Sequence, residues 1–409
     1  MFIRFSLALL LLGSVVADVW PQWRGPTRDG RVAGPDWPAD LHAGRLDRAW
    51  RMPFGPSYSG PIVSETAVFT TETQDKKLEV VHALDRKTGR ERWRQEWEGA
   101  MSVPFFAKSN GDWIRATPAL DGNVLYVAGM RDVLVALDAA NGAVKWRRDF
   151  VAELKTPLPA FGNVSSPLVE GDGLFVQSGA AVMRLNKATG EVVWRAMENR
   201  DAMNASPFSS PVIATVAGQR QLLIQTRTEL AGLELEKGEV LWRQPVEAFR
   251  GMNILTPTVS GDRVLTSAYG GKTHAFEIRA ESGRFSVAEA WQFKAQGYMC
   301  SPVLVDGHAY LHLRNNRALC LDAATGAEKW TTSESFGKYW NLVTRGDRIL
   351  ALDERGELLL FRANPAKFDL VDRRKVSDQD SWAHLALADT QVFIRDLDGL
   401  SAWTWKAAP

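Results

Sequence analysis

Apolar and polar residues alternate in short runs along almost the whole chain, and tight turns separate the runs. In one clear example, the alternating run 133–137 is followed by Asp138 and then by Asn141-Gly142. An Asn-Gly pair favours the positive φ angles that a tight hairpin turn requires. Beyond the turn the chain alternates again up to Trp146. The pattern predicts two adjacent strands joined by a hairpin turn.

This motif recurs at a regular interval. It consists of a strand, a Gly turn and a returning strand that carries Trp. The turn glycines are Gly89, Gly142, Gly190, Gly238, Gly283 and Gly326, which lie 53, 48, 48, 45 and 43 residues apart. The tryptophans that follow them are Trp93, Trp146, Trp194, Trp242, Trp291 and Trp330. A period of about 45 residues without a helical pattern is typical of propeller blades with four strands each.

A small residue followed by Pro marks the first strand of each repeating unit. The pairs are Gly60-Pro61, Thr117-Pro118, Ser166-Pro167, Ser210-Pro211, Thr256-Pro257 and Ser301-Pro302. Proline is tolerated there because its missing N–H is harmless at the first residue of a strand. Two less regular copies follow, with first strands expected at 341–343 and 383–387. The expected number of blades is therefore eight.

The last of these blades lacks a fourth strand, and a matching segment stands alone near the N-terminus. Residues 383–405 supply three strands, whereas residues 46–51, which include Trp50, follow no other strands of a blade. We therefore predict an all-β, eight-bladed β-propeller of four-stranded antiparallel blades, closed by an N-terminal strand that completes the last blade. Such closure removes free sheet edges. A seven-bladed ring with irregular ends is the alternative.

The sixteen tryptophans have a structural explanation in this scheme. Each repeat Trp would lie on the outermost strand of its blade and cover the Gly turn of an adjacent blade. Burial of an indole in this way removes about 150–250 Å² of surface from water. We therefore assign the repeated Trp and Gly positions to the fold and not to a cofactor.

The N-terminus has the features of a secretory signal. Arg4 precedes the apolar segment 5–12, and small residues lead to a predicted cleavage site after Ala17. An uncleaved anchor is the alternative. No Cys lies at the end of the apolar segment, where a lipid anchor would require one, so we expect a periplasmic or secreted protein without a membrane anchor. The expected parts are a signal peptide at 1–17, a Trp- and Pro-rich arm that packs on the body at 18–45, and a single propeller domain at 46–409.

Charge and cysteine content narrow the possibilities further. The net charge of +1 gives no reason to expect binding to nucleic acid or to an anionic membrane. Cys300 and Cys320 are the two cysteines, and the strand assignment places them two strands apart. That separation is about 10 Å, which is beyond disulfide reach. Two buried free thiols are therefore favoured over a bridge.

The repeat, for example Leu84-Asp85-Arg86-Lys87-Thr88-Gly89 followed by Trp93, resembles the pyrroloquinoline-quinone (PQQ)-like propeller repeat, and the resemblance covers residues 46–405. That family includes quinone-dependent alcohol dehydrogenases and the propeller lipoprotein of the outer-membrane β-barrel assembly machinery, which binds partners without catalysis. The dehydrogenases typically carry two adjacent cysteines beside the cofactor and a Glu, an Asn and an Asp around calcium. This chain has no adjacent cysteines, and no such trio can be assigned. The lipidated Cys of the assembly protein is also missing.

The longest loops are those that lead into the first strands, and they are predicted to gather on one face of the ring. Residues directly before each first strand would then surround the mouth of the central channel. These are Tyr58, Arg115, Asn163, Ser209, Asn253, Tyr298, Trp340 and Trp382, with His384 just inside. Aromatic residues with a few polar groups suit a small-molecule or peptide pocket. The simpler alternative is that these side chains only fill the channel.

The sequence offers no catalytic or metal-binding constellation. His384 is a lone candidate base without a readable carboxylate partner, and a buried structural histidine is the simpler interpretation. His308 and His312 lie about 13 Å apart on one strand, too far for one ion. We therefore expect no catalytic residue, no metal and no cofactor.

Two functions remain after these exclusions. We expect a non-catalytic, monomeric propeller that acts as a binding or scaffold module through its long-loop face, with a protein or small-molecule partner. The alternative is a PQQ-dependent oxidoreductase of the alcohol or sugar dehydrogenase type, with PQQ and calcium held in the channel.

Overall fold

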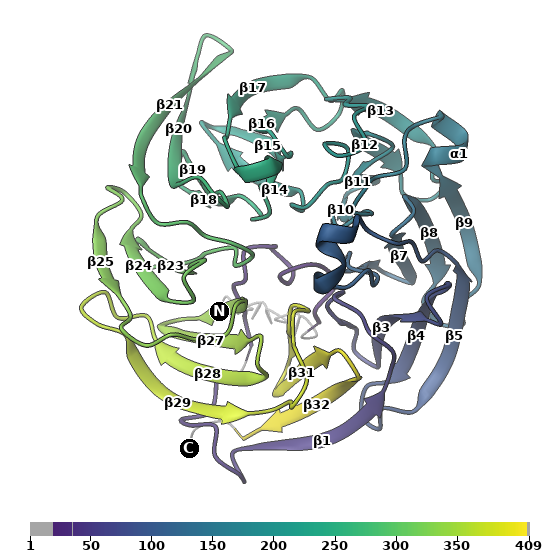
Figure 1. Cartoon of the computed structure of the whole chain (residues 1–409), viewed down its shortest axis with the longest axis vertical. Coiled ribbons are helices and arrows are strands. Elements are labelled where there is room, and N and C mark those ends of the chain that lie inside the picture. The colour runs from purple at the N-terminus through teal and green to yellow at the C-terminus, as the bar shows by residue number, and fades with distance from the viewer. Residues whose placement is uncertain (1–18, 35, 407–409) are drawn as a thin grey trace, which may run out of the picture.

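Eight four-stranded antiparallel sheets stand around a central axis (Figure 1). The computed structural model describes residues 19–34 and 36–406, and the predicted signal peptide at 1–17 lies outside them. Each sheet is formed by strands that follow one another in the chain, except the last. The fold is therefore the eight-bladed β-propeller that the sequence predicts, and the seven-bladed alternative is wrong.

The strands run from the channel outward in chain order within blades 1 to 7. Blades 1 and 2 contain β2 (Ile62–Val63), β3 (Ala67–Gln74), β4 (Leu78–Asp85), β5 (Glu91–Glu98), β6 (Ala119–Asp121), β7 (Val124–Gly129), β8 (Val133–Asp138) and β9 (Val144–Asp149). Blades 3 and 4 contain β10 (Leu168–Glu170), β11 (Gly173–Ser178), β12 (Ala181–Asn186), β13 (Val192–Ala196), β14 (Val212–Val216), β15 (Gln219–Gln225), β16 (Glu229–Leu233) and β17 (Val240–Pro245). Blades 5 and 6 contain β18 (Thr258–Ser260), β19 (Arg263–Ser267), β20 (Thr273–Glu281), β21 (Arg284–Phe293), β22 (Val303–Val305), β23 (His308–His312), β24 (Ala318–Asp322) and β25 (Glu328–Thr331). Blade 7 contains β26 (Trp340–Arg345), β27 (Arg348–Asp353), β28 (Glu357–Arg362) and β29 (Asp369–Lys375). Blade 8 contains β30 (Ala386–Ala388), β31 (Gln391–Asp396), β32 (Gly399–Trp405) and β1 (Leu46–Pro53).

The closing strand β1 pairs antiparallel with β32, so the two ends of the chain share blade 8. Leu46 lies opposite Trp405, and Pro53 lies opposite Gly399. This pairing confirms the predicted closure. The turn between β31 and β32 contains Asp398, which accepts a hydrogen bond from Arg51 of β1.

Burial explains why the middle strands are almost continuously apolar. In blade 2, five of the six residues of both β7 and β8 are buried, whereas every residue of β9 except Val144, Lys145 and Arg147 is half-buried and none is buried. The two faces of a middle strand pack against neighbouring blades, while the outermost strand meets solvent. The sequence therefore shows apolar runs for the middle strands and alternation for the outer ones.

Tryptophans of the outermost strands join most neighbouring blades. Each indole covers the turn glycine of the next blade, and its Nε1 donates to a main-chain carbonyl of that turn at 3.0–3.1 Å. At Gly89, where φ is +72°, a Cβ would lie 2.7 Å from the ring of Trp50. The pairs are Trp50 with Gly89, Trp93 with Gly142, Trp146 with Gly190, Trp194 with Gly238, and Trp291 with Gly326. The predicted role of these residues is therefore confirmed.

Trp242 departs from this arrangement, so the prediction that it covers the neighbouring blade is wrong. Its ring lies over Gly232 of its own blade, and its Nε1 donates to Gln221 Oε1 at 2.7 Å. The corresponding turn at Gly283 ends the long hairpin of β20 and β21, which projects from the ring (Figure 1). The stretched hairpin carries Gly283 out of reach of Trp242. Between blades 4 and 5 lies an open cavity of about 940 Å³.

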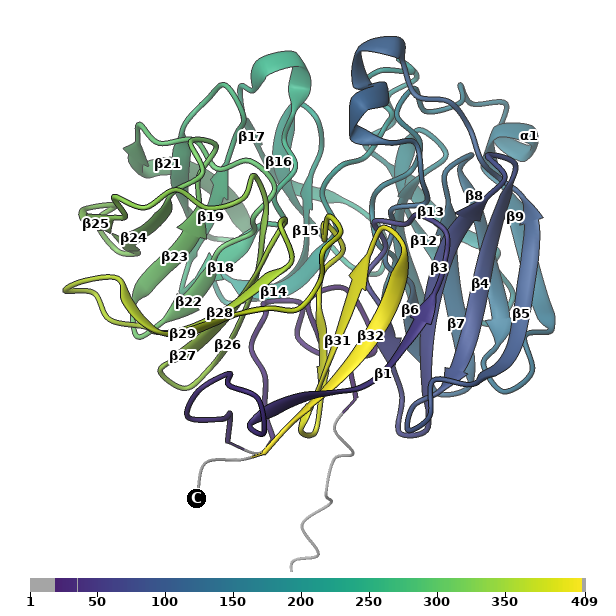
Figure 2. The same ribbon diagram turned by 60° about the horizontal axis from the view of Figure 1, so that its bottom comes forward.

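Residues 19–34, called the arm below, cross one end of the channel (Figure 2). Trp20 forms a bridge with Val63, and Pro21 O accepts a hydrogen bond from the N–H of Leu120. Trp23 Nε1 donates to Thr256 Oγ1 at 3.0 Å. Further contacts extend the arm to the first-strand regions of blades 3, 6, 7 and 8. The arm therefore ties seven blades together and covers this end of the channel.

Two further observations complete the fold. Cys300 and Cys320 are buried free thiols, as favoured by the sequence. No helix within the described residues is long and apolar enough to cross a membrane.

Candidate binding face at the channel mouth

The end of the channel opposite the arm carries the long loops, and we call it the loop face. It is formed mainly by residues 99–118, 150–167, 197–211 and 246–257, which include the short helices η1 (Phe105–Asn110), α1 (Phe150–Leu154) and η2 (Phe249–Gly251). Figure 2 shows the helical turns at the top and the arm below. The molecule thus has one end covered by its own chain and one end built of irregular loops.

Exposed apolar side chains are concentrated on the loop face. Phe105 is 85% exposed, and Phe106 and Phe249 are 46% and 51% exposed. Together with Met203 they make four of the six large hydrophobic side chains exposed in the described part of the chain. Such a concentration on one face is typical of an interaction surface.

A cavity of about 250 Å³ opens among these loops, and we call it the mouth cavity. Its walls are mostly aromatic rings and methionines, with three arginines between them. The lining side chains include Phe106, Phe161, Phe208, Phe249, Tyr269, Tyr298, Met203, Met252, Met299, Arg115, Arg227 and Arg250. No Asp or Glu is among the described residues that line it.

Arg227 is the most buried of the three arginines, with 3% of its surface exposed. It lies in the turn between β15 and β16, and its guanidinium carbon lies 4.4 Å from the ring centre of Phe208 and 5.1 Å from that of Phe161. Its Nη2 donates to the carbonyl of Arg250. Its Nε and Nη1 are buried and have no hydrogen-bond partner among the described residues. Burial lowers the pKa of Arg227 to about 10.

The other two arginines lie on aromatic rings at the rim. Arg250 lies 5.4 Å from the ring centre of Phe106 and 5.1 Å from that of Phe249. Arg115 lies 5.7 Å from the ring centre of Tyr58, and its Nη2 donates to the carbonyl of Gly111. Stacking of this kind holds a guanidinium in place without neutralising its charge.

Beside the mouth cavity, a cluster of aromatic rings surrounds Lys338. Its Nζ lies 5.0 Å from the ring centre of Tyr339, 5.5 Å from Trp382 and 5.7 Å from Tyr298. Tyr58 stacks on Trp382 with 4.5 Å between ring centres. These rings fill the side of the channel mouth formed by blades 7 and 8.

The structure brings only some of the predicted mouth residues together. Tyr58, Arg115, Tyr298 and Trp382 lie in one cluster at the mouth. Three others are buried and hold loops by hydrogen bonds: Asn163 with Ser178, Ser209 with the carbonyl of Leu255, and Asn253 with the carbonyls of Arg227 and Val246. Whether any of these residues binds a ligand stays a prediction.

Trp340 and His384 lie away from the mouth. Trp340 begins β26, is 1% exposed and packs against Phe336 and His312, while Tyr339 takes the place at the mouth. A shift of one residue along a strand moves a side chain to the other face, which accounts for this difference. His384 lies at the arm end, between Trp20 and Trp23.

His384 has the environment of a structural histidine. Its Nδ1 donates to the carbonyl of Leu385 at 2.8 Å. Burial lowers its pKa to about 3, so the ring is neutral near pH 7. It has no ion pair with a carboxylate among the described residues. A general base needs a pKa near the working pH, which this ring does not have.

Sequence reasoning missed Arg227, Arg250, Lys338 and Tyr339. Arg227 lies two residues after the second strand of its blade, so the strand pattern could have placed it in a turn. The absence of an acidic partner for Arg227 could not have been found from sequence, because it depends on which loops fold over this side chain.

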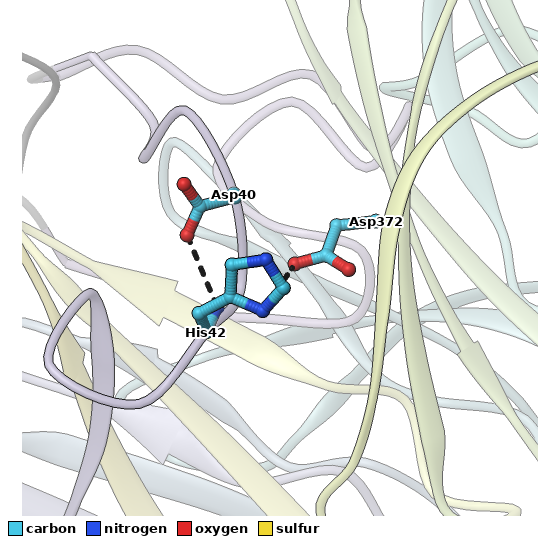
Figure 3. Close-up of side chains that lie close together, drawn as sticks. All are labelled: Asp40, His42 and Asp372. Carbon is cyan, nitrogen blue, oxygen red and sulfur yellow. Dashed lines mark hydrogen bonds and ion pairs between the residues drawn. The ribbon is translucent and has the colours of Figure 1, made fainter.

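One group of side chains has the composition of a metal site (Figure 3). Ligand atoms of Asp40, His42 and Asp372 lie within 4.8 Å of one another. Their oxygens already accept main-chain hydrogen bonds: Asp372 Oδ2 from Leu41 N–H at 2.7 Å and Asp40 Oδ1 from His42 N–H at 3.1 Å. The group therefore fastens residues 40–42 to β29.

The mouth cavity does not suit PQQ with calcium. Calcium takes carboxylate and carbonyl oxygens as ligands, whereas the described lining of the mouth cavity has no carboxylate, three arginines and only one side-chain carbonyl, that of Asn110. Neither thiol is among the described residues that line the mouth cavity: Cys300 follows the lining residue Met299 but is itself buried, and Cys320 lies on β24. We therefore derive no reaction step through that cofactor.

Comparison with known proteins agrees with the fold. The chain is 24% identical over 341 residues to outer membrane protein assembly factor BamB of Moranella endobia, and the match covers 79% of each chain. It is 23% identical over 287 residues to BamB of Yersinia pestis, covering 68% of this chain and 67% of that one.

Solved structures show the same architecture at low identity. BamB from Moraxella catarrhalis matches with a TM-score of 0.65 and 15% identity, over 88% of this chain and 100% of that one. Quinohemoprotein alcohol dehydrogenase from Comamonas testosteroni matches with a TM-score of 0.66 and 13% identity, over 96% of this chain and 81% of that one. Residues 77–332 match the sequence model of a PQQ-like family. The chain therefore belongs to the PQQ-like propeller family described as outer membrane protein assembly factor BamB.

Proposed function

We propose that this protein is an exported, non-catalytic propeller that binds a protein partner through its loop face and serves as a scaffold in outer-membrane protein assembly. The observation that carries the proposal is the concentration of exposed Phe105, Phe106 and Phe249 on this one face. Exposed aromatic side chains that become buried on binding supply much of the affinity of protein interfaces.

The distribution of hydrogen bonds supports the choice of this face. At the arm end, the channel is covered by residues 19–34, whose main chain and side chains bond to the body. The loop face keeps exposed rings and a cavity instead. The curated relatives are named as outer membrane protein assembly factors, which supports the class of partner.

The chemistry of the face also favours binding over catalysis. Arginine, methionine and aromatic side chains provide contact surface and hydrogen-bond donors. A general base, a nucleophile with an adjacent base, and a set of metal ligands are all missing from the described lining of the mouth cavity. We therefore infer a role that requires no bound cofactor.

Site-specific photo-crosslinking in the native host tests the proposal. A photoreactive amino acid placed at Phe106 is expected to crosslink to a component of the outer-membrane assembly machinery, identified by mass spectrometry. The matched control is Val144 on the rim of blade 2, which is 49% exposed. The same crosslinked products from both positions, or none from Phe106, would contradict the proposal.

The second candidate function is a quinone-dependent dehydrogenase. Its support is the fold shared with the quinohemoprotein alcohol dehydrogenase. Titration of the purified protein with PQQ and calcium tests it directly. Saturable binding together with dye reduction by alcohols or sugars would establish this function, and a flat titration would remove it.

A further inference from the structure

We propose that the mouth cavity captures a carboxylate of the protein partner, from an Asp or Glu flanked by bulky apolar residues, with Arg227 as the anion-binding side chain. This inference rests on the proposed function and specifies the chemistry of the partner segment. It is argued from the state of Arg227, the composition of the mouth cavity and the surface around it.

Arg227 is a buried cation whose donors are largely unused. It is 3% exposed, and Nε and Nη1 have no hydrogen-bond partner among the described residues. It also forms no ion pair within 4.0 Å in the described part of the chain, whereas two other buried arginines do: Arg184 contacts Asp172 and Glu236, and Arg86 contacts Asp389. Burial of a charged group without a partner is costly, so a site that retains one gains from a ligand of opposite charge.

The remaining arginines make the mouth cavity electropositive. Arg250 and Arg115 line the same cavity, and no described Asp or Glu does. An arginine fork binds a carboxylate through two parallel hydrogen bonds, and on the end edge of the Arg227 guanidinium both N–H groups of Nη1 are free, beside Nη2, which has a second N–H besides the one it donates to Arg250. The rings of Phe161 and Phe208 hold the guanidinium in place on its faces. The unpaired donors are buried, so an anion reaches them when flexible side chains of the mouth cavity, such as its methionines, move aside.

The size and walls of the mouth cavity favour a peptide side chain over a cofactor. Its volume of about 250 Å³ is below the range of about 300–1,000 Å³ that is usual for drug-sized ligands. Methionines line it, and their flexible side chains adapt to varied apolar groups. A carboxylate with one adjacent apolar side chain matches this space and these walls.

The surface around the mouth cavity points to a protein segment and not to a free small acid. Phe105 extends the apolar surface beyond the cavity, Phe249 lines its rim, and both are more than half exposed. A small carboxylate inside the cavity would leave these rings in water. A peptide chain that continues out of the cavity would cover them.

Calorimetry with two capped peptides tests the inference. Acetyl-Leu-Phe-Glu-Leu-Phe-amide is compared with the same peptide in which Gln replaces Glu, against wild type, Arg227→Met, Arg227→Lys and Arg220→Met. Arg220 is the matched control, because it lies at the other end of β15 and is half exposed. Wild type is expected to bind the Glu peptide at least tenfold more tightly than the Gln peptide.

The variants are expected to separate charge from geometry. Arg227→Met should reduce the affinity for the Glu peptide to that for the Gln peptide, while Arg220→Met should bind both as wild type does. Arg227→Lys should keep part of the preference, because it retains the charge but loses the fork. Unchanged peak shape in gel filtration and an unchanged far-ultraviolet spectrum establish that each variant is folded.

Four outcomes would overturn the inference. These are equal binding of both peptides by wild type, an unchanged preference in Arg227→Met, no binding of either peptide at 1 mM (the highest concentration tested, about the weakest affinity of interest), and binding of phenylpropionate as tight as that of the Glu peptide. If crosslinking from Phe106 persists while the peptide preference is missing, carboxylate capture is wrong and the proposed function stands. If crosslinking fails as well, both are wrong.

Discussion

The two ends of the channel both contain buried arginines, but they use them differently. At the arm end, Arg24 donates to the carbonyls of Asp29 and Pro302, and Arg28 donates to those of Ser166 and Pro167. At the loop face, Arg227 donates only through Nη2, to the carbonyl of Arg250. Burial lowers the pKa of all three, to about 10 for Arg24, 9 for Arg28 and 10 for Arg227. Burial of a charge therefore does not mark a binding site here, whereas the number of unused donors differs: Arg28 leaves only Nε without a partner, and Arg227 leaves both Nε and Nη1.

The junctions between blades show a parallel difference. Where Trp291 covers Gly326, the indole closes the outer part of the junction. Between blades 4 and 5 this contact is missing, because Trp242 packs within its own blade. Blades 4 and 5 also supply Arg227 and Phe249 to the mouth cavity. The less tightly joined region thus coincides with the proposed binding region.

The largest expected effect comes from exchanging the buried arginines for methionine. Arg24→Met removes the donors to two buried carbonyls, and each unpaired buried group costs about 1–3 kcal/mol. We expect the free energy of unfolding to fall by about 2–6 kcal/mol. Arg227→Met leaves few groups unpaired and removes a desolvated charge, so we expect a change within about 1 kcal/mol. Urea unfolding measures both values.

The comparison of Arg24→Met with Arg227→Met needs a control at an exposed arginine. Arg220→Met, at an exposed position, should leave the unfolding midpoint almost unchanged. If Arg24→Met and Arg227→Met destabilise the protein equally, the two ends do not differ in the way their hydrogen bonds indicate.

The fold was largely predictable from sequence because its signals are local and repeated. The turn at Gly142 needs a positive φ, which is +77° in the structure, and the returning strand places Trp93 of the previous blade over it. Each such turn restricts the chain to a hairpin, and repetition supplies the blade count. The unpaired segment 46–51 fixed the closure, because a propeller leaves no blade incomplete.

The second largest effect is expected at His384 at the arm end, whose burial as a neutral ring should make the free energy of unfolding fall in acid. Its pKa is about 3 in the folded protein, against about 6.5 when exposed. The unfolded chain therefore binds more protons between pH 6.5 and 3, so the stabilisation present above pH 6.5 is lost as the pH falls. The expected slope is about 1.4 kcal/mol per pH unit in this window.

His384→Gln isolates this contribution. His312, whose pKa burial lowers to about 4, is present in both proteins and cancels in the difference. The stability of wild type minus that of His384→Gln should fall by about 2 kcal/mol between pH 6.5 and 5. A difference that does not depend on pH would show that His384 is protonated in the folded state.

The candidate site was less predictable, because it depends on contacts between loops that are distant in sequence. Tyr339 and Trp340 are adjacent, and the one that faces the channel is set by where β26 begins. Phe161 and Phe208, which hold Arg227, come from different blades. Nothing in the local pattern around residue 227 indicates that these rings meet there.

The third effect compares a closed junction with the open one. Gly326→Ala places a Cβ 2.5 Å from the ring of Trp291, whereas Gly283→Ala meets no described atom within 4 Å. The backbone φ is +72° at Gly326 and +76° at Gly283, so the conformational strain of a Cβ is nearly equal. We expect Gly326→Ala to lower the free energy of unfolding by about 1–2 kcal/mol more than Gly283→Ala. Equal losses would mean that the indole moves away at little cost.

The smallest effect on stability is expected from Phe105→Ser on the loop face, because the side chain is 85% exposed. Few contacts are lost, so the free energy of unfolding should change by less than about 0.5 kcal/mol. Crosslinking from position 106 should nevertheless weaken, since the ring centre of Phe105 lies only 5.6 Å from that of Phe106 and both belong to the same exposed patch. At the arm end the opposite holds: Trp20 is 2% exposed, and Trp20→Ser should cost several kcal/mol, about 3–5 for loss of a buried aromatic ring. A variant that loses partner contact without losing stability therefore separates a binding surface from a structural one. If Phe105→Ser destabilises the protein as Trp20→Ser does, the loop face is held together by its aromatic rings and is not available to a partner.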